Sequence, residues 1–282
     1  MAKVRALLSF LHGQLSDWLH SPRTLLSGLI ILTLTYMAAR NYQFTIESGG
    51  LYVHFGESVF YFLSTGFGNF PLTSALFLIM VSEVPRRVSF QNLMLIRGKR
   101  SSWFLSQVLF CLMITIMMIV SMLVISLLFS LPSITSGCGW SDLERIAAGT
   151  DEGYTLVHTF VLDLPVFQAT LMAGAVLTCF WFVMAFTIFL FSIFGKPNLG
   201  LLFYAILLSL KVIVLWESLS EFNLFMPTDY ATISNIANVR SGYDEIHITY
   251  IALIVYAVII CVYIAIGYFR SKWMDLHFSE TK

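Results

Sequence analysis

The sequence predicts an all-α integral membrane protein with six transmembrane helices, an N-terminal interfacial amphipathic helix and a cytoplasmic helix between the second and third spans. Of its 282 residues, 58% are hydrophobic and 11% are charged, whereas about a quarter of the residues of a soluble domain are charged. The apolar residues gather into uncharged runs, and a spanning helix needs about 20 such residues. These observations exclude a soluble globular enzyme and a disordered chain.

Residues 1–22 are expected to form a separate helix that lies in the membrane interface. Ser21 and Pro22 end the pattern, and a helix with one apolar and one polar face lies in the plane of the membrane surface. The apolar residues that recur at helical spacing are Val4, Leu7, Leu8, Leu11, Leu15, Trp18 and Leu19.

The rest of the chain, residues 23–282, is predicted to form one transmembrane domain. Its second span contains Gly66, Gly68 and Pro71, so we expect either a break with a short helix on each side or a simple kink. The fourth is long enough to tilt or to project beyond the bilayer. The six spans are expected near residues 24–40, 58–83, 104–131, 160–194, 199–217 and 247–269.

The distribution of charge sets the orientation. With both termini in the cytoplasm, most of the 16 Lys and Arg residues fall on the cytoplasmic side, as the positive-inside rule requires. A multi-pass protein of the plasma (inner) membrane is predicted. The cytoplasmic bases are Lys3, Arg5, Arg23, Arg86, Arg87, Arg97, Lys99, Arg100, Lys196, Arg270, Lys272 and Lys282.

Motifs of known chemistry are missing from the sequence. It has no G-x-x-x-x-G-K-[ST] nucleotide loop, no H-E-x-x-H and no G-x-S-x-G. Its four cysteines are spread through apolar runs and one external loop, which indicates neither a disulfide framework nor a metal site. We therefore expect no enzyme activity, no metal or cofactor bound by this chain, and no nucleic-acid partner.

Three charges fall inside or beside the predicted spans. Asp163 lies near the outer end of span four, Lys211 lies within span five, and Glu217 follows six residues later. Charges at such depth are costly, and they are usually paired and often functional. An Asp163–Lys211 or Lys211–Glu217 pair could serve a proton relay or simply lock two helices together. The structural role is favoured.

The cytoplasmic stretch at about 84–100 combines basic and apolar residues. Pro85 predicts the start of a short helix and Gly98 its end, and Ser101 and Ser102 are expected to cap the next span. The stretch is either an anchor on anionic lipid or a docking helix for a cytoplasmic partner. The residues expected to meet such a partner are Arg86, Arg87, Phe90, Leu93, Met94, Arg97 and Arg100.

Four features make the chain resemble the permease subunits of type-2 ABC exporters. An amphipathic helix precedes the first span, and a cytoplasmic helix joins spans two and three. The joint between spans four and five is short, at residues 195–198, and a broken, partly polar stretch with Pro227 follows span five. The motif that leads into span three consists of Arg97, Gly98, Arg100 and Trp103.

The resemblance implies a subunit that forms a translocation path as a dimer, with a second copy or a related permease. A separate nucleotide-binding ATPase subunit would bind ATP and Mg²⁺. The helix at about 84–100 would be the coupling helix that docks on the ATPase. The region at about 218–246 would hold re-entrant helices that close the outer gate, while the external loop at about 133–158 is too short for a domain.

The substrate expected for such an exporter is an amphipathic drug, peptide or lipid-like molecule. Span four carries many aromatic residues on all its faces. We expect most of these rings to face lipid, while others could line the route. The alternative function is an ion- or proton-coupled secondary carrier that uses Asp163 and Lys211, although the sequence lacks the internal repeat typical of such folds. The aromatic residues are Phe180, Trp181, Phe182, Phe186, Phe189, Phe191 and Phe194.

Overall fold

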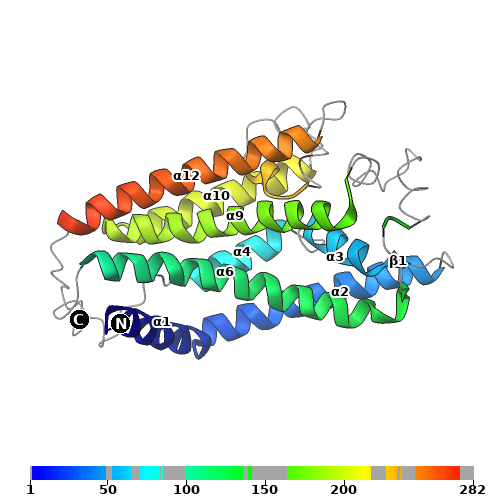
Figure 1. The fold of residues 1–282 in the computed structure, drawn as a ribbon, viewed down its shortest axis with the longest axis horizontal. Helices are drawn as coiled ribbons and strands as arrows, with labels where there is room; N and C mark the ends of the chain where they lie inside the picture. Colours follow the sequence, from blue (N-terminus) through cyan, green and yellow to red (C-terminus); the bar gives the residue numbers. More distant parts are fainter. Residues whose placement is uncertain are drawn as a thin grey trace.

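The protein is mostly α-helical, and its long helices run along the long axis of the molecule (Figure 1). Four of them are long and apolar enough to cross a membrane, namely Pro22–Asn41, Arg100–Ser130, Val166–Ile193 and Ile246–Lys272. The structure is a computed structural model. It describes residues 2–48, 53–64, 70–82, 84, 100–135, 139–141, 164–216, 227–233, 236 and 245–273.

The first part of the chain forms two helices in succession, a short strand and two shorter helices. Their bounds are α1 Ala2–Leu19, α2 Pro22–Ser48, β1 Val53–His54, α3 Phe55–Ser64 and α4 Phe70–Val81. The later part forms longer helices joined by short elements. Their bounds are α6 Arg100–Ser130, η1 Leu131–Ser133, β2 Ile134–Thr135, α9 Val166–Ile193, α10 Pro197–Trp216, η4 Pro227–Tyr230 and α12 Glu245–Trp273.

The predicted second span consists of two helices. Helix α3 ends at Ser64 and α4 begins at Phe70, so helices lie on both sides of the expected break, although residues 65–69 are outside the described part. Pro71 is the second residue of α4, a position at which a missing backbone donor costs little. Each helix alone is short, and the two together match the predicted length.

Two helix starts differ from the expectation. Helix α6 begins at Arg100, so Ser101 and Ser102 lie inside its first turn and do not cap it. Helix α9 begins at Val166 and not at residue 160, and Pro165 is its N-cap residue. Pro165 has the extended backbone angles φ −58° and ψ 141°, which stop a helix from continuing through it.

Helix α9 is the central helix of the bundle. It contacts α3, α4, α6, α10 and α12. Of the 18-residue stretch of α9 that is apolar enough to cross a membrane, 78% is buried inside the protein. The expectation that most of its rings face lipid was therefore wrong. Phe77 of α4 stacks on Trp181 with 4.7 Å between ring centroids. The buried aromatic residues of α9 are Phe180, Trp181, Phe182, Phe186 and Phe189.

The joint between α9 and α10 is as short as predicted, and the sequence explains it. Gly195 has φ +76°, a conformation that glycine adopts without steric cost. The Gly195 N–H donates to Ser192 O and the Lys196 N–H donates to Phe191 O, both at 2.9 Å. These two bonds close the end of α9 as a Schellman motif, and Pro197 then starts α10.

Helix α1 packs on the bundle through part of its expected apolar face. Leu11 and Trp18 are buried, whereas Leu8 and Leu19 are exposed. The Trp18 indole Nε1–H donates to Met80 O of α4 at 3.2 Å. Helix α1 also contacts α6, beside the first turns of that helix (Figure 1). A helix over residues 2–19 is thus present, and its position in the membrane interface stays a prediction.

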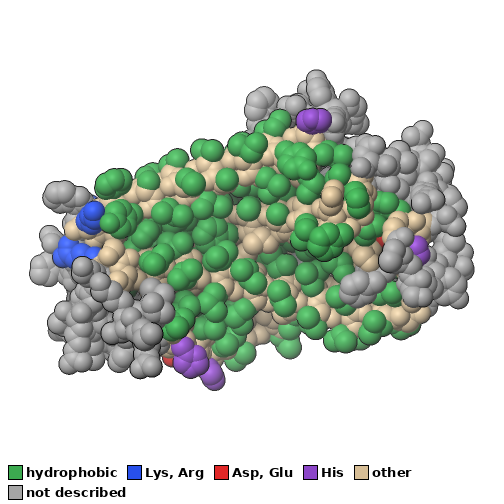
Figure 2. All heavy atoms as spheres, viewed as in Figure 1, with side chains coloured by type: hydrophobic (Ala, Val, Ile, Leu, Met, Phe, Trp, Pro, Cys, Tyr) green, Lys and Arg blue, Asp and Glu red, His purple; other side chains and the backbone are tan. Residues whose placement is uncertain are grey.

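The surface side chains are sorted by type on the face of the described bundle that Figure 2 draws. Apolar side chains cover the middle of that face, and Lys and Arg side chains lie at the left end (Figure 2). We call this end, where α6 and α10 begin and α9 and α12 end, the basic end. Its described bases are Arg100, Lys196, Arg270 and Lys272. The chain is therefore an α-helical membrane protein by composition and by the distribution of its surface residues.

Candidate functional site

Lys211 forms a buried ion pair with Asp229. The Lys211 Nζ donates to Asp229 Oδ1, and Lys211 is 2% exposed while Asp229 is 0% exposed. Lys211 lies in the second half of α10, and Asp229 lies in the 3₁₀ helix η4. The pair joins α10 to the segment that follows it. Neither charge would be stable alone in an apolar interior, so each side chain holds the other in place.

A second contact holds the same segment to α12. The Tyr256 hydroxyl donates to Tyr230 O at 3.0 Å and lies 3.4 Å from Pro227 O. The last carbonyl group of a helix has no partner in the helix's own backbone, and the phenol supplies a donor for it at Tyr230. Residues 227–230 are therefore fixed on one side by α10 and on the other by α12.

A third polar contact lies on α9. The Thr187 hydroxyl donates to Val183 O at 2.7 Å. It also lies 3.4 Å from the Tyr204 hydroxyl of α10 and 3.4 Å from the Tyr263 hydroxyl of α12. Three helices thus meet at one hydroxyl group inside the apolar core.

These residues form one polar seam among α9, α10, α12 and η4. Helical spacing explains it, because positions seven apart fall on the same face of a helix. Tyr204 and Lys211 are seven apart on α10, and Tyr256 and Tyr263 are seven apart on α12. The polar seam can hold the segment 227–230 in place. Its members are Thr187, Tyr204, Lys211, Asp229, Tyr256 and Tyr263.

A separate polar cluster closes the end of the bundle opposite to the basic end. The Glu57 carboxylate is 1% exposed. It accepts the His54 N–H at 2.8 Å and also the Ser141 N–H. His54 Nδ1 lies 2.8 Å from Gly139 O, and the Trp140 Nε1–H donates to Leu164 O at 2.8 Å. One buried carboxylate thus ties the loop after α6 to the start of α3.

Strands β1 and β2 strengthen the same closure. They pair in parallel, with Val53 opposite Ile134 and His54 opposite Thr135. These two-residue strands were not predicted from the sequence; β1 precedes span two and β2 lies in the predicted external loop at 133–158. The expectation that this loop is too short for a domain stays a prediction, because most of the loop lies outside the described residues.

The basic end is also tied together. The Arg100 guanidinium Nη1–H donates to Lys272 O at 2.8 Å, so the first residue of α6 holds the last turn of α12. The Lys272 Nζ lies 4.5 Å above the Tyr268 ring, and the Arg270 guanidinium lies 5.4 Å above the Phe194 ring of α9. Such cation–π contacts are favourable at exposed sites.

Two of the predicted site residues are described. Lys211 is buried in the polar seam, and its observed partner is Asp229, which the sequence analysis had not considered. Arg100 is exposed at the basic end. Asp163 and Glu217 lie outside the described residues, and so do six of the docking residues, namely Arg86, Arg87, Phe90, Leu93, Met94 and Arg97.

The other seam residues were missed for identifiable reasons. Asp229 lies in a partly polar stretch that reads as an ordinary exposed loop. Tyr256 and Tyr263 resemble interfacial or lipid-facing tyrosines. Their seven-residue spacing, matched by Tyr204 and Lys211 on α10, was the available signal.

No group of three or more His, Cys, Asp or Glu side chains in the described ranges could hold a metal ion. Comparison with known proteins adds no relative, because no protein family, no curated protein and no solved structure matches the chain.

Proposed function

We propose that the chain is the permease subunit of an ATP-driven ABC exporter, which works as a dimer with separate ATPase subunits. The observation that carries the proposal is that α12 is bonded in its last turn and again near its middle to two segments that such a machine must move together. Lys272 O accepts from Arg100, the last residue of the predicted coupling helix. Tyr256 donates to the segment 227–230 in the predicted outer-gate region.

Helix α12 can transmit a displacement between these two points. At about 1.5 Å per residue, the stretch from Tyr256 to Lys272 is about 24 Å long. This helix contacts α9 and α6, and a push on Arg100 would act on a continuous helix and not on a flexible linker. Coupling of this kind requires two global states that differ in their contacts at both sites.

The six-span arrangement belongs to this proposal. Arg100 at the start of α6 meets Lys272 at the end of α12, and β1 before α3 pairs with β2 after α6. These contacts support a chain that alternates in direction, with the pair α3–α4 and the helix α10 as the second and fifth passes. On this topology both termini, the basic end and residues 84–100 are cytoplasmic.

The test is the capture of a partner ATPase. The full-length chain is purified in mild detergent from its native membrane, and co-purified ATPase activity and any protein with a G-x-x-x-x-G-K-[ST] loop are measured. We expect such a protein in the purified material. The double variant Phe90→Asp, Leu93→Asp should insert normally and lose both the partner and the ATPase activity.

The matched control for this experiment is His12→Asp, which adds a charge to an exposed position of α1 outside the proposed coupling helix. It should keep the partner. Normal association of the ATPase with the Phe90→Asp, Leu93→Asp variant would rule out the docking assignment. Absence of any nucleotide-binding protein from wild-type material would rule out the exporter.

The Lys211–Asp229 pair favours a second candidate function, an ion- or proton-coupled carrier. Asp229 would then take the place of Asp163 as the partner of Lys211, since a buried pair of this type can bind and release a proton. Purified protein in vesicles with an imposed proton gradient and no ATP separates the two functions. A carrier acidifies the vesicle lumen in a manner abolished by Asp229→Asn, whereas the exporter subunit conducts no protons.

A further inference from the structure

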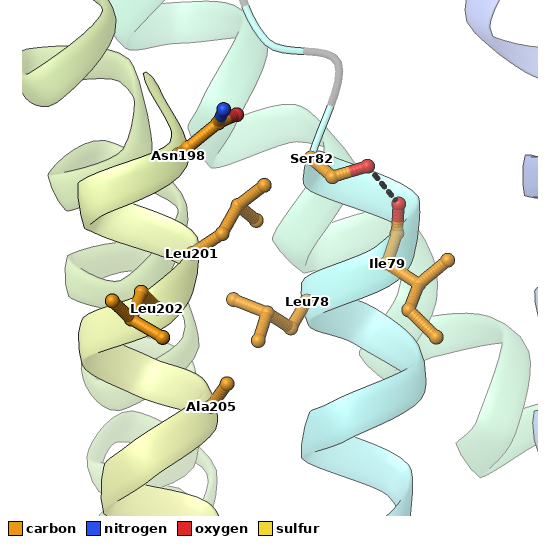
Figure 3. A pocket seen from close by; sticks show the side chains of 7 residues that line it. All are labelled: Leu78, Ile79, Ser82, Asn198, Leu201, Leu202 and Ala205. Carbon is orange, nitrogen blue, oxygen red and sulfur yellow. Dashed lines mark hydrogen bonds between the residues drawn. The ribbon is translucent and has the colours of Figure 1, made fainter. Parts of the chain in front are cut away.

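An apolar groove runs between α4 and α10 near the basic end, outside the polar seam. Its volume is about 380 Å³. Leu78 and Ile79 form its α4 wall, and Leu202 and Ala205 form its α10 wall (Figure 3). It opens to the outside of the bundle, because Ile79 is 47% exposed and Leu202 is 54% exposed. Both helices are apolar, and where they lie in a bilayer this shared surface would meet lipid tails.

Polar groups stand at one end of the groove only. Figure 3 shows Asn198 on α10 and Ser82 at the end of α4, both at the same end, with apolar side chains below them. The Ser82 hydroxyl donates to Ile79 O at 2.7 Å, which leaves its oxygen lone pairs to accept. The Asn198 amide is exposed and can donate. This order, polar at the end and apolar along the length, matches a lipid molecule.

The charge beside the polar end favours an anionic lipid. Lys196 lies two residues before Asn198, is exposed, and precedes the first turn of α10. The positive end of the α10 dipole points in the same direction. From Asn198 to Ala205, α10 rises about 10 Å, which is most of the roughly 15 Å that one leaflet contributes to a hydrocarbon core of about 30 Å.

We propose that the groove between α4 and α10 is a binding site for one acyl chain of an anionic phospholipid, whose phosphate is held by Lys196 and Asn198. The occupant is a lipid of the leaflet at the basic end. The site does not depend on the exporter function, because it requires only that α4 and α10 lie in a bilayer. Lipid bound there would fill the space between the two helices and hold α10 at a fixed distance from α4.

A photoreactive lipid tests the site. The full-length chain is reconstituted into vesicles of equal parts phosphatidylcholine and phosphatidylglycerol, with a trace of either lipid that carries a diazirine in its acyl chain. After illumination, peptide mass spectrometry locates the adducts. We expect the phosphatidylglycerol probe to label Leu78, Leu202 and their neighbours several times more strongly than the phosphatidylcholine probe does.

Four variants test the site further. Ala205→Trp fills the groove and should reduce labelling of its walls several-fold, and Leu202→Trp should do the same if Ala205→Trp folds poorly. Leu210→Trp is the matched control, because Leu210 is exposed on the same helix outside the groove, and it should leave labelling unchanged. Lys196→Gln should remove the preference for phosphatidylglycerol while phosphatidylcholine labelling stays the same.

Two outcomes would overturn the proposal. Equal labelling by both probes, unaffected by Ala205→Trp, would mean that the groove is ordinary lipid-facing surface. Formation of a disulfide-linked pair of chains by Ala205→Cys, together with loss of lipid adducts, would mean that a second copy of the chain occupies the groove.

Discussion

At the scale of single residues, the Lys211–Asp229 pair is the costliest feature of the core. Moving two charges out of water costs several kcal/mol each, and their mutual attraction repays that cost only with good geometry and further hydrogen bonds. Both side chains are almost fully buried, so solvent hardly screens the attraction between the two charges. Its structural effect is directional, since it binds η4 to α10 at one place and in one orientation.

Removal of one partner should therefore destabilise the protein more than removal of both. We expect Lys211→Met to cost about 3–5 kcal/mol, because Asp229 would remain buried without its cation. The double variant Lys211→Met, Asp229→Asn should recover most of that loss. Tryptophan fluorescence during denaturant unfolding in detergent measures both. Equal losses in the single and double variants would mean that the two charges do not interact.

Gln107 is the opposite case, because it is a buried polar side chain without a hydrogen bond among the described residues to offset the cost of its burial. It is 0% exposed on α6, and neither its amide nitrogen nor its amide oxygen has a hydrogen-bond partner in the described part of the protein. An unsatisfied buried amide costs about 1–3 kcal/mol. Gln107→Met, of similar volume, should raise the unfolding temperature.

The control for Gln107 is Thr115→Val on the same helix. Thr115 is equally buried, but its hydroxyl donates to Cys111 O at 2.9 Å, so its loss should bring no gain. A lower unfolding temperature for Gln107→Met than for the wild type would mean that the amide has a partner such as a bound water.

At the scale of elements, the positions of the helices could be predicted from the sequence and their neighbours could not. Uncharged runs locate spans because each must bury its backbone in hydrocarbon, and the break near Pro71 and the joint at Gly195 follow from local backbone chemistry. The central position of α9 does not, since a span that faces lipid and one that faces protein are equally apolar. The rings of Phe180 and Trp181 were misassigned for that reason.

The same limit explains why most residues of the polar seam were not predicted from the sequence. Lys211 was recognisable because a charge in an apolar run is rare, whereas its partner lies outside the helices, in a segment whose approach to α10 depends on tertiary structure. Tyr256 and Tyr263 are apolar enough to pass as lipid-facing residues. Their hydrogen bonds, from Tyr256 to Tyr230 O and between Thr187 and Tyr263, become visible only when α9 and η4 are placed beside α12.

Close packing of α12 on α6 depends on Gly267. A Cβ atom at this position would lie 2.5 Å from Phe104 Cε2 and 2.9 Å from Leu190 Cδ2, which is closer than carbon atoms pack. Gly267→Ala should push α12 away from α6 and α9 and cost about 1–3 kcal/mol, as overpacking does. The unfolding temperature in detergent measures the effect.

The matched control for Gly267 is Gly28→Ala on α2. A Cβ atom there would have no neighbour within 4 Å, so the substitution should stabilise the helix by about 0.5–1 kcal/mol. If Gly267→Ala proves equally stabilising, α12 and α6 are not in close contact.

At the scale of the whole molecule, the two ends of the bundle are closed by different means. Backbone donors converge on one buried carboxylate, Glu57, at the end near β1, whereas exposed cations pair with a carbonyl and with rings at the basic end. The first closure is shielded from water and specific in geometry, and the second is open to the surroundings.

The orientation proposed from the positive-inside rule can be tested directly. In a variant without other cysteines, native Cys138 in the predicted external loop should react with a membrane-impermeant maleimide on intact cells. Lys196→Cys, in the turn between α9 and α10, should react only after the membrane is permeabilised, because the positive-inside rule puts the basic end in the cytoplasm. The reverse pattern would invert the topology, and labelling of both sites on intact cells would contradict a membrane passage between them.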